Sequence, residues 1–241
     1  MVQKQEGVSY DLADSRYEIE REALDPIGAV IVEVPAQNED EFIHATALEA
    51  DALIARGRRI SRTIIENLDK CVVIGLGSVG ADTVDVDAAT DHGIVVTNVP
   101  DYCMDEVTDH ALGMILALNR RLVPHNRAVT AGAWNDVVLN QPMHRTKDAT
   151  LGIIGFGRIG RAWAVKARGF GMNILAYDPL IDTDASVGGA RTVGFNELLD
   201  QADFVSLHVP LLPETENLIG ETELARMKPG SIIVNCARGG L

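Results

Sequence analysis

Short apolar runs alternate with longer amphipathic segments along the first hundred residues. The apolar runs lie at residues 29–34, 52–55, 71–74 and 94–96, and we predict a strand at each. The segments between them, residues 40–48, 61–68 and 85–92, are predicted helices. This alternation indicates an α/β fold with a parallel sheet and right-handed crossovers. A first strand would fall near residues 8–12, but VSYDL is a poor strand sequence, so we expect a short or irregular N-terminus.

The pattern changes at Pro100, where a long helical repeat begins. Residues 105–122 place apolar side chains at helical spacing, with acids in the first turn and arginines in the last, which agrees with the helix dipole. Residues 124–147 contain Trp134 and few strand signals, which is typical of a surface loop or of a segment that packs on a partner subunit. Alternation then resumes, with strands predicted at 151–154, 173–177, 203–207 and 231–235 and helices at 158–170, 195–201 and 221–227. We therefore predict two parallel-sheet domains, residues 1–102 and 103–241.

A glycine fingerprint follows the strand at residues 151–154. Gly155, Gly157 and Gly160 form the G-x-G-x-x-G pattern and open a predicted helix. The first glycine allows a tight turn, the second lets the backbone approach a pyrophosphate, and the third lets the helix pack close to the strand. The next strand ends at Asp178, whose carboxylate would accept hydrogen bonds from a ribose 2′-OH and repel a 2′-phosphate. The order of these features predicts a site for NAD rather than NADP, with another nucleoside ligand, such as a methyl-donor cofactor, as the alternative.

A second G-x-G-x-x-G pattern occurs earlier, at Gly75, Gly77 and Gly80. The residues that follow it include three acids, which would repel phosphate: Asp82, Asp85 and Asp87. We therefore interpret this stretch as a tight loop with exposed N–H groups that holds a smaller anion, such as a carboxylate. The predicted substrate-binding residues in it are Ser78, Val79 and Gly80.

Arg238 lies three residues past the end of the last predicted strand, and two glycines follow it. In an open parallel sheet the ligand lies beyond the carboxyl ends of the strands, so the loops at Gly155, Asp178, His208 and Arg238 should converge. The guanidinium of Arg238 could present two parallel donors to a carboxylate, and we predict that it is the catalytic-site arginine that holds the substrate. The alternative is an arginine that pairs with a surface acid.

The overall charge and composition indicate which kinds of partner the protein can bind. The formal net charge of −14 would repel nucleic acid and anionic membranes, and no basic cluster offsets it. No stretch approaches the roughly 18 apolar residues of a membrane span, and the N-terminus lacks a signal-peptide core, so we expect a cytoplasmic protein. Cys71, Cys103 and Cys236 are odd in number and lack metal-ligand spacing, so we expect reduced thiols and no metal site.

Three stretches together resemble the NAD-dependent D-isomer-specific 2-hydroxyacid dehydrogenases. They are TLGIIGFGRIGRAWAVKARGFGMNILAYDP, ADFVSLHVPLLPETENLI and MKPGSIIVNCARGGL. The block GADTVDVDAATDHGIVVTNVPDYCMDEVTDHALGMIL resembles the branch that contains the carboxy-terminal binding proteins and their bacterial relatives. The resemblance covers the chain from about Glu18 to the end.

This resemblance implies an NAD-binding Rossmann domain inserted in a flavodoxin-like substrate domain, and a homodimer formed through the Rossmann domain. It implies a small 2-keto or 2-hydroxy acid as substrate, with its carboxylate bound by Arg238. The cofactor contacts that it implies are Val107, Arg158, Ile159, Asp178, His208, Pro210, Thr215, Cys236 and Ala237.

Two departures limit what the resemblance transfers. Relatives often carry an arginine or an aromatic residue near Leu76 and Gly77, and this chain has neither, so the substrate stays open. The family's catalytic Glu and His lie downstream of the matching arginine, whereas the sequence stops three residues after Arg238. We therefore expect a truncated chain that is inactive alone, because reduction of a keto acid needs a proton donor for the developing alkoxide. His208 is the tempting substitute, but the family places this histidine along the cofactor.

Three hypotheses follow from the sequence. The first is an NAD-dependent D-2-hydroxyacid dehydrogenase whose given chain is incomplete. The second is a dimeric, NAD(H)-sensing binding protein of the corepressor kind, without turnover. The third is a natural truncation that binds NAD or pairs with a full-length subunit.

Overall fold

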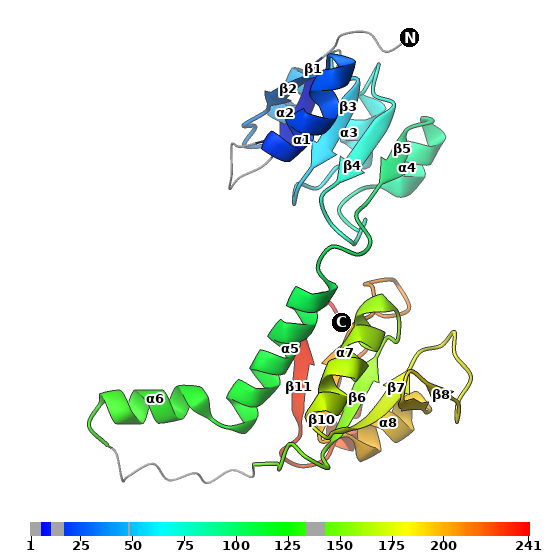
Figure 1. Cartoon of the computed structure of the whole chain (residues 1–241). Helices are drawn as coiled ribbons and strands as arrows, with labels where there is room; N and C mark the ends of the chain where they lie inside the picture. The colour runs from blue at the N-terminus through cyan, green and yellow to red at the C-terminus, as the bar shows by residue number, and fades with distance from the viewer. Residues whose placement is uncertain (1–5, 11–16, 48, 134–142) are drawn as a thin grey trace. The chain divides into compact units, whose positions relative to one another are not determined.

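The computed structural model describes residues 6–10, 17–47, 49–133 and 143–241. The chain divides into two compact units, Met1–Tyr102 and Cys103–Leu241, called unit 1 and unit 2 below (Figure 1). Each unit is built around its own parallel sheet. In the part of the chain that the structure describes, no helix is long and apolar enough to cross a bilayer.

Unit 1 contains a five-stranded, all-parallel sheet with the order β2-β1-β3-β4-β5. The strands are β1 (Glu6–Tyr10), β2 (Val30–Glu33), β3 (Ala52–Ala55), β4 (Val73–Leu76) and β5 (Val95–Thr97). The helices are α1 (Glu18–Leu24), α2 (Glu39–Thr46), α3 (Arg62–Glu66) and α4 (Val86–Asp91), with a 3₁₀ turn at Asp25–Ile27. This strand order is that of flavodoxin-like folds, which confirms the predicted class of the unit.

The expectation of an irregular N-terminus was wrong. Residues 6–10 form β1, which lies between β2 and β3 and pairs with both. A strand held on both sides gains its hydrogen bonds from its neighbours, so its polar sequence does not prevent it from forming. Tertiary pairing therefore outweighs local propensity at this position.

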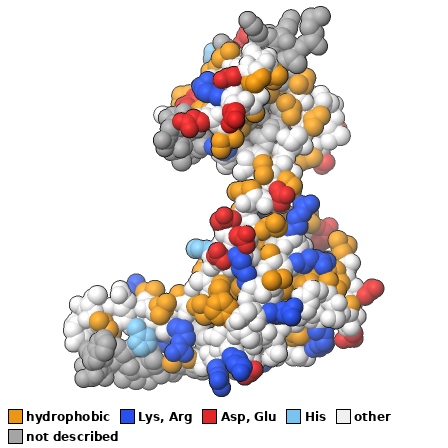
Figure 2. All heavy atoms as spheres, in the orientation of Figure 1, with side chains coloured by type: hydrophobic (Ala, Val, Ile, Leu, Met, Phe, Trp, Pro, Cys, Tyr) orange, Lys and Arg blue, Asp and Glu red, His pale blue; other side chains and the backbone are white. Residues whose placement is uncertain are grey.

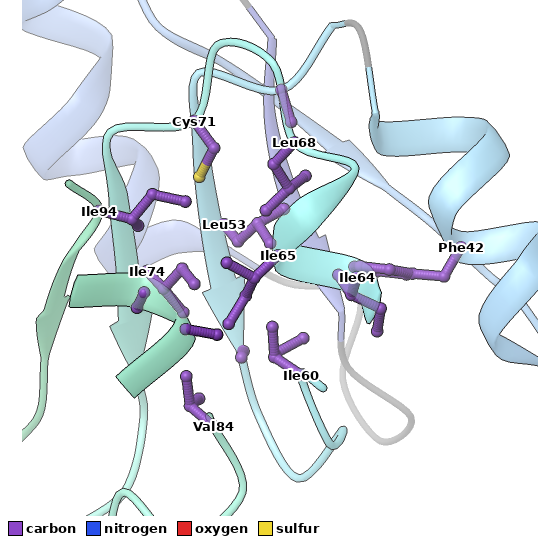
Figure 3. Close-up of a cluster of buried hydrophobic side chains, with 14 of the residues drawn as sticks. Phe42, Leu53, Ile60, Ile64, Ile65, Leu68, Cys71, Ile74, Val84 and Ile94 are labelled. Atoms are coloured by element: carbon purple, nitrogen blue, oxygen red, sulfur yellow. The ribbon is translucent and has the colours of Figure 1, made fainter. Parts of the chain in front are cut away.

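Three helices of unit 1 begin at side chains that cap their free N–H groups. The side chains of Asn38, Ser61 and Asp85 accept hydrogen bonds from backbone amides three residues further on. Asp85 is one of the acids that follow the second glycine pattern, and its carboxylate occupies the position where a phosphate would have to bind. Ile64 and Ile65 of α3 are fully buried and belong to the apolar core cluster of unit 1 (Figure 3).

Unit 2 contains a six-stranded sheet with the order β11-β10-β6-β7-β9-β8. The strands are β6 (Thr150–Ile154), β7 (Asn173–Tyr177), β8 (Ser186–Val187), β9 (Ala190–Thr192), β10 (Phe204–Leu207) and β11 (Ile232–Asn235). All neighbours are parallel except β8 and β9, a short antiparallel pair at the edge that the sequence analysis did not predict. From β9 to β11 the order is 3-2-1-4-5 in chain sequence, which confirms the predicted Rossmann fold.

Five helices accompany this sheet in the described part of unit 2. They are α5 (Met104–Asn119), α6 (Leu122–Thr130), α7 (Arg158–Gly169), α8 (Phe195–Gln201) and α9 (Glu221–Arg226). The ammonium group of Lys166 on α7 lies 3.0 Å from a carboxylate oxygen of Asp105 and 2.6 Å from one of Asp109, and it thereby joins α7 to α5. Trp163 on the same helix is fully buried in the core of the unit.

The predicted helix at residues 105–122 is α5, which ends three residues earlier than predicted. α5 ends at Asn119, and Arg121 adopts a left-handed conformation with φ of 52° before α6 begins. The predicted loop at 124–147 therefore starts within a helix, and α6 projects away from the body of the sheet (Figure 1). Trp134 lies outside the described residues.

Cys71, Cys103 and Cys236 are not paired with one another in the structure. Among the described residues, no group of three or more His, Cys, Asp or Glu side chains could hold a metal ion.

Candidate functional site

Four parallel strands of unit 2 end in register. Pairing joins the last residues of β7, β6, β10 and β11 in one row, which consists of Tyr177, Ile154, Leu207 and Asn235. The next residue on each strand lies at the carboxyl edge of the sheet, and these residues are Asp178, Gly155, His208 and Cys236. The structure thus brings the predicted cofactor loops to one edge, where α/β sheets bind their ligands.

The three glycines after β6 meet different surroundings. Gly155 has φ of +90°, and a Cβ built on it would lie 2.7 Å from the carbonyl carbon of His208. A Cβ on Gly160 would lie 2.2 Å from the carbonyl oxygen of Gly155, so α7 can approach the loop only with glycine there. A Cβ on Gly157 would meet nothing within 4 Å. Gly155 and Gly160 are therefore required by the fold, whereas the space over Gly157 is open to a ligand.

The N-terminus of α7 faces this open space without a side-chain cap. Gly157 is the N-cap residue, and the amides of Arg158, Ile159 and Gly160 have no acceptor among the described residues. Gly157 and Arg158 are exposed. Unpaired N–H groups and the positive end of the dipole of a 12-residue helix together favour an anion here.

Asp178 is fixed by two backbone hydrogen bonds. One carboxylate oxygen accepts from the amide of Phe156 at 2.9 Å, and the other accepts from the amide of Leu180 at 3.0 Å. The side chain is half-buried at the end of β7, beside the glycine loop. Each carboxylate oxygen keeps a second lone pair, so Asp178 can still accept from a ligand hydroxyl in a fixed orientation.

His208 follows β10 and contacts the glycine loop. Its backbone amide donates to the carbonyl of Ile154 at 2.7 Å, and its ring Nε2 lies 2.8 Å from the hydroxyl oxygen of Ser206. Burial lowers the pKa of His208 from 6.5 to about 4, so the ring is neutral at physiological pH. A neutral ring with that pKa is a weak candidate for the proton donor in a reduction at neutral pH.

Pro210 and Thr215 belong to one turn after His208. The hydroxyl of Thr215 donates to the carbonyl of Pro210 at 2.7 Å and accepts from the amide of Leu212 at 2.8 Å. The Thr215 hydroxyl therefore holds the turn that follows His208. Its predicted cofactor contact stays a prediction.

A cavity of about 570 Å³ lies between α5 and the end of β11. It is lined by Glu106, Val107, His110, Met114, Asn235, Cys236 and Ala237. Three predicted cofactor residues, Val107, Cys236 and Ala237, thus meet at one cavity. Burial raises the pKa of the Cys236 thiol, which keeps it protonated and unreactive.

The other residues that line the cavity were not predicted. Glu106, His110 and Met114 recur every four residues on α5 and so share one face of the helix. His110 is exposed and lines the cavity, and its spacing from Val107 was the signal that could have placed it there.

Arg238 is held along its own loop. Its Nη1 donates to the carbonyl of Ala237 at 3.0 Å, and its carbonyl accepts from the side chain of Asn235 at 2.7 Å. The Asn235 side chain also accepts from the amide of Ala237 at 2.9 Å, so it braces the turn from both sides. Arg238 directly follows Ala237, the last residue that lines the cavity. Its predicted contact with a substrate carboxylate stays a prediction.

The predicted anion loop of unit 1 begins later than its glycine pattern. Gly75 lies inside β4, so only Gly77 and Gly80 belong to the loop. The carbonyls of Ser78, Val79 and Gly80 accept hydrogen bonds from Val99, Asn98 and Ser78, respectively. Within the described residues, the amides of these three positions donate to no protein acceptor. Three successive unpaired N–H groups can receive a small anion.

Arg56 lies beside this loop and was not predicted. It follows β3, the strand next to β4, and a Cβ on Gly77 would lie 3.1 Å from its Cγ. Its guanidinium forms an ion pair with Glu20. The signal in the sequence was an arginine directly after an apolar strand, which is similar to the signal that singled out Arg238, three residues past β11.

Comparison with known proteins places unit 2 in a described family. Residues 112–241 match the family model described as "D-isomer specific 2-hydroxyacid dehydrogenase, NAD binding domain". A D-3-phosphoglycerate dehydrogenase of Methanocaldococcus jannaschii is 39% identical over 233 residues, which are 95% of this chain and 44% of that protein. A glyoxylate reductase of Thermococcus litoralis is 41% identical over 198 residues, which are 79% of this chain and 60% of that protein.

A solved structure supports the same family assignment. The crystal structure of a glyoxylate reductase from Paecilomyes thermophila superposes with a TM-score of 0.86 at 31% sequence identity. The match covers 98% of this chain and 74% of that one. The chain spans about half the length of the two curated relatives named above.

Proposed function

The chain belongs to the D-isomer-specific 2-hydroxyacid dehydrogenase family, and we propose that the protein is an NAD-dependent oxidoreductase that reduces a small 2-keto acid to the D-2-hydroxy acid. The observation that carries this proposal is the row of strand ends in unit 2. It gathers a glycine loop, an uncapped helix N-terminus and a fixed carboxylate at one edge. Each of these features suits a different part of a dinucleotide.

The residues of unit 2 fit NAD. The amides that open α7 would hold the pyrophosphate over the open face of Gly157, and Asp178 would accept from the adenosine ribose. The fixed charge of Asp178 would repel the 2′-phosphate of NADP. The cavity at Val107, Cys236 and Ala237 would enclose the nicotinamide half. When bound, the reduced cofactor supplies the hydride.

The substrate class follows from the anion-binding groups. Arg238 would turn from the carbonyl of Ala237 to bind a carboxylate through two parallel donors, as only a guanidinium can. In unit 1, the amides of residues 78–80 form a second anion site, with Arg56 beside it. The names of the relatives, glyoxylate reductase and D-3-phosphoglycerate dehydrogenase, support a short 2-keto or 2-hydroxy acid.

Calorimetry and a turnover assay test this proposal. We expect saturable binding of NADH to the purified protein, with much weaker binding of NADPH. We also expect NADH oxidation by the complete protein with at least one of glyoxylate, hydroxypyruvate or pyruvate. Binding without turnover across a broad panel of 2-keto acids would favour the alternative, an NAD(H)-sensing binding protein. Absence of NADH binding by a folded preparation would overturn both functions.

We also propose that unit 2 forms a homodimer through α6. Several apolar side chains of α6 and the end of α5 are exposed, and they include Leu118, Leu122, Val123 and Val129. Figure 2 shows hydrophobic side chains on the surface of these two helices. Beside them lies a cavity of about 650 Å³, which α5, α6 and β11 line with mainly apolar residues. A projecting apolar helix beside an apolar cavity suits a second copy of the same chain, because one symmetric contact would cover both.

Sedimentation of single variants tests the dimer. Leu122→Glu should convert a dimer to a monomer, because it would bury a carboxylate in an apolar contact. Val165→Glu is the matched control, since Val165 is an exposed apolar residue on α7, and this variant should leave the mass unchanged. A monomeric unmutated protein at micromolar concentration would contradict the proposal.

A further inference from the structure

Ser206 is a fully buried polar residue in the middle of the unit 2 sheet. It lies on β10 in register with Ile153 on β6 and Val234 on β11, and its relative exposure is 0%. At this exposure its hydroxyl does not contact bulk water. Among the described residues, the one partner of that hydroxyl is Nε2 of His208, at 2.8 Å.

The direction of this hydrogen bond follows from the need to satisfy the buried hydroxyl. If the ring donated to Ser206, the hydroxyl hydrogen would have no acceptor among the described residues, and a buried donor without an acceptor costs free energy. If Ser206 donates instead, both groups are satisfied. Nε2 is then an acceptor and carries no hydrogen.

The tautomer of His208 follows from this direction. A neutral imidazole has one N–H, so a ring that accepts at Nε2 carries its hydrogen on Nδ1. Burial keeps the ring neutral, because it lowers the pKa of His208 to about 4. Within the described part of the chain, Nδ1 has no partner, and the side chain is only partly buried at the carboxyl edge of the sheet.

We propose that Ser206 is a positioning residue that fixes His208 as a neutral Nδ1–H donor, and that this donor binds an oxygen of the dinucleotide. The second part rests on the proposed function. His208 lies in the row between Gly155, where the pyrophosphate would bind, and Cys236, which lines the cavity for the nicotinamide half. The oxygens available at that point are those of the phosphate and of the neighbouring ribose.

A neutral donor at this position affects how the two redox forms of the cofactor bind. It directs one hydrogen bond at the cofactor without adding a charge, so it can hold the oxidised and the reduced dinucleotide in the same place. An imidazolium would add charge and would bind through both nitrogens. Burial prevents this because it keeps the ring neutral.

Nuclear magnetic resonance of the ring nitrogens tests the tautomer directly. The chain has six histidines, and loss of one signal in His208→Asn identifies the ring of His208. We expect a neutral Nδ1–H pattern at pH 7. In Ser206→Ala the Nε2–H tautomer should appear, and Ser206→Thr, which keeps a hydroxyl, should restore Nδ1–H. An Nε2–H pattern in the unmutated protein would overturn the proposal whether or not the variants fold.

Two substitutions of His208 test the contact with the cofactor. The side-chain nitrogen of asparagine can occupy the position of Nδ1, whereas that of glutamine reaches the position of Nε2. His208→Asn should therefore keep the NADH dissociation constant within about twofold, and His208→Gln should raise it roughly fivefold or more, the loss of one hydrogen bond. Equal weakening by both variants would refute the contact while leaving the tautomer measurable. Failure of the unmutated protein to bind NADH would instead refute the proposed function.

Discussion

The neutral His208 makes the stability of unit 2 depend on pH. Burial lowers its pKa from 6.5 to about 4, so between these values the unfolded chain binds a proton that the folded chain does not. The stabilisation is fully present above pH 6.5 and is lost as the pH falls towards 4. The pKa difference between 6.5 and about 4, at about 1.4 kcal/mol for each unit, corresponds to about 3.5 kcal/mol of unfolding free energy.

Urea denaturation at pH 7, 5.5 and 4.5 measures this loss. Both tryptophans, Trp134 and Trp163, lie in unit 2, so their fluorescence reports its unfolding. His208→Asn removes the titrating group, and we expect this variant to lose about 2 to 3 kcal/mol less than the unmutated protein over that range. His110→Asn is the matched control, because His110 is exposed, and it should follow the unmutated protein. Equal losses in His208→Asn and the unmutated protein would refute the burial argument.

Three further predictions concern the cofactor and substrate groups. Gly157→Ala should fold normally and weaken NADH binding at least tenfold, as measured by calorimetry. Gly160→Ala should instead lower the melting temperature, because its Cβ would overlap the carbonyl oxygen of Gly155. Normal NADH binding by Gly157→Ala would refute the assigned site. Asp178→Ala should weaken NAD binding and reduce the discrimination against NADP, and equal affinities for both cofactors in the unmutated protein would contradict this. Arg238→Lys should raise KM for the keto acid about tenfold or more with little change in NADH affinity, because an ammonium group cannot form the paired contact. Weaker NADH binding with an unchanged KM for the keto acid would exclude the substrate role.

Much of unit 2 could be predicted because its local signals agree with its packing. The strand at 173–177 and the helix at 195–201 were predicted with their observed bounds, since apolar runs and glycines mark their ends. The glycine loop was recognisable because backbone contacts require glycine at two of its positions. The register of the strand ends was not predictable in detail, although the rule that ligands bind at carboxyl edges gave the right set of loops.

The elements that were missed depend on contacts distant in sequence. β1 has a polar sequence and forms because β2 and β3 hold it on both sides. The break between α5 and α6 lies at Arg121, which adopts a left-handed conformation without the glycine or asparagine that usually marks one. The hydrogen bond between Ser206 and His208 was not predicted either. Residues two apart on a strand point to the same face, but the sequence does not show whether their side chains form a hydrogen bond.

The two amides held by Asp178 bear on redesign of cofactor preference. A change to NADP would replace this acid with a smaller or basic residue, and the usual reasoning considers only the charge that is removed. In this protein the same substitution also releases the backbone of Phe156 and Leu180, so the turn beside the glycine loop would lose its anchor. An engineer should therefore expect Asp178→Asn, which retains one acceptor, to be a better starting scaffold than Asp178→Ser or Asp178→Arg.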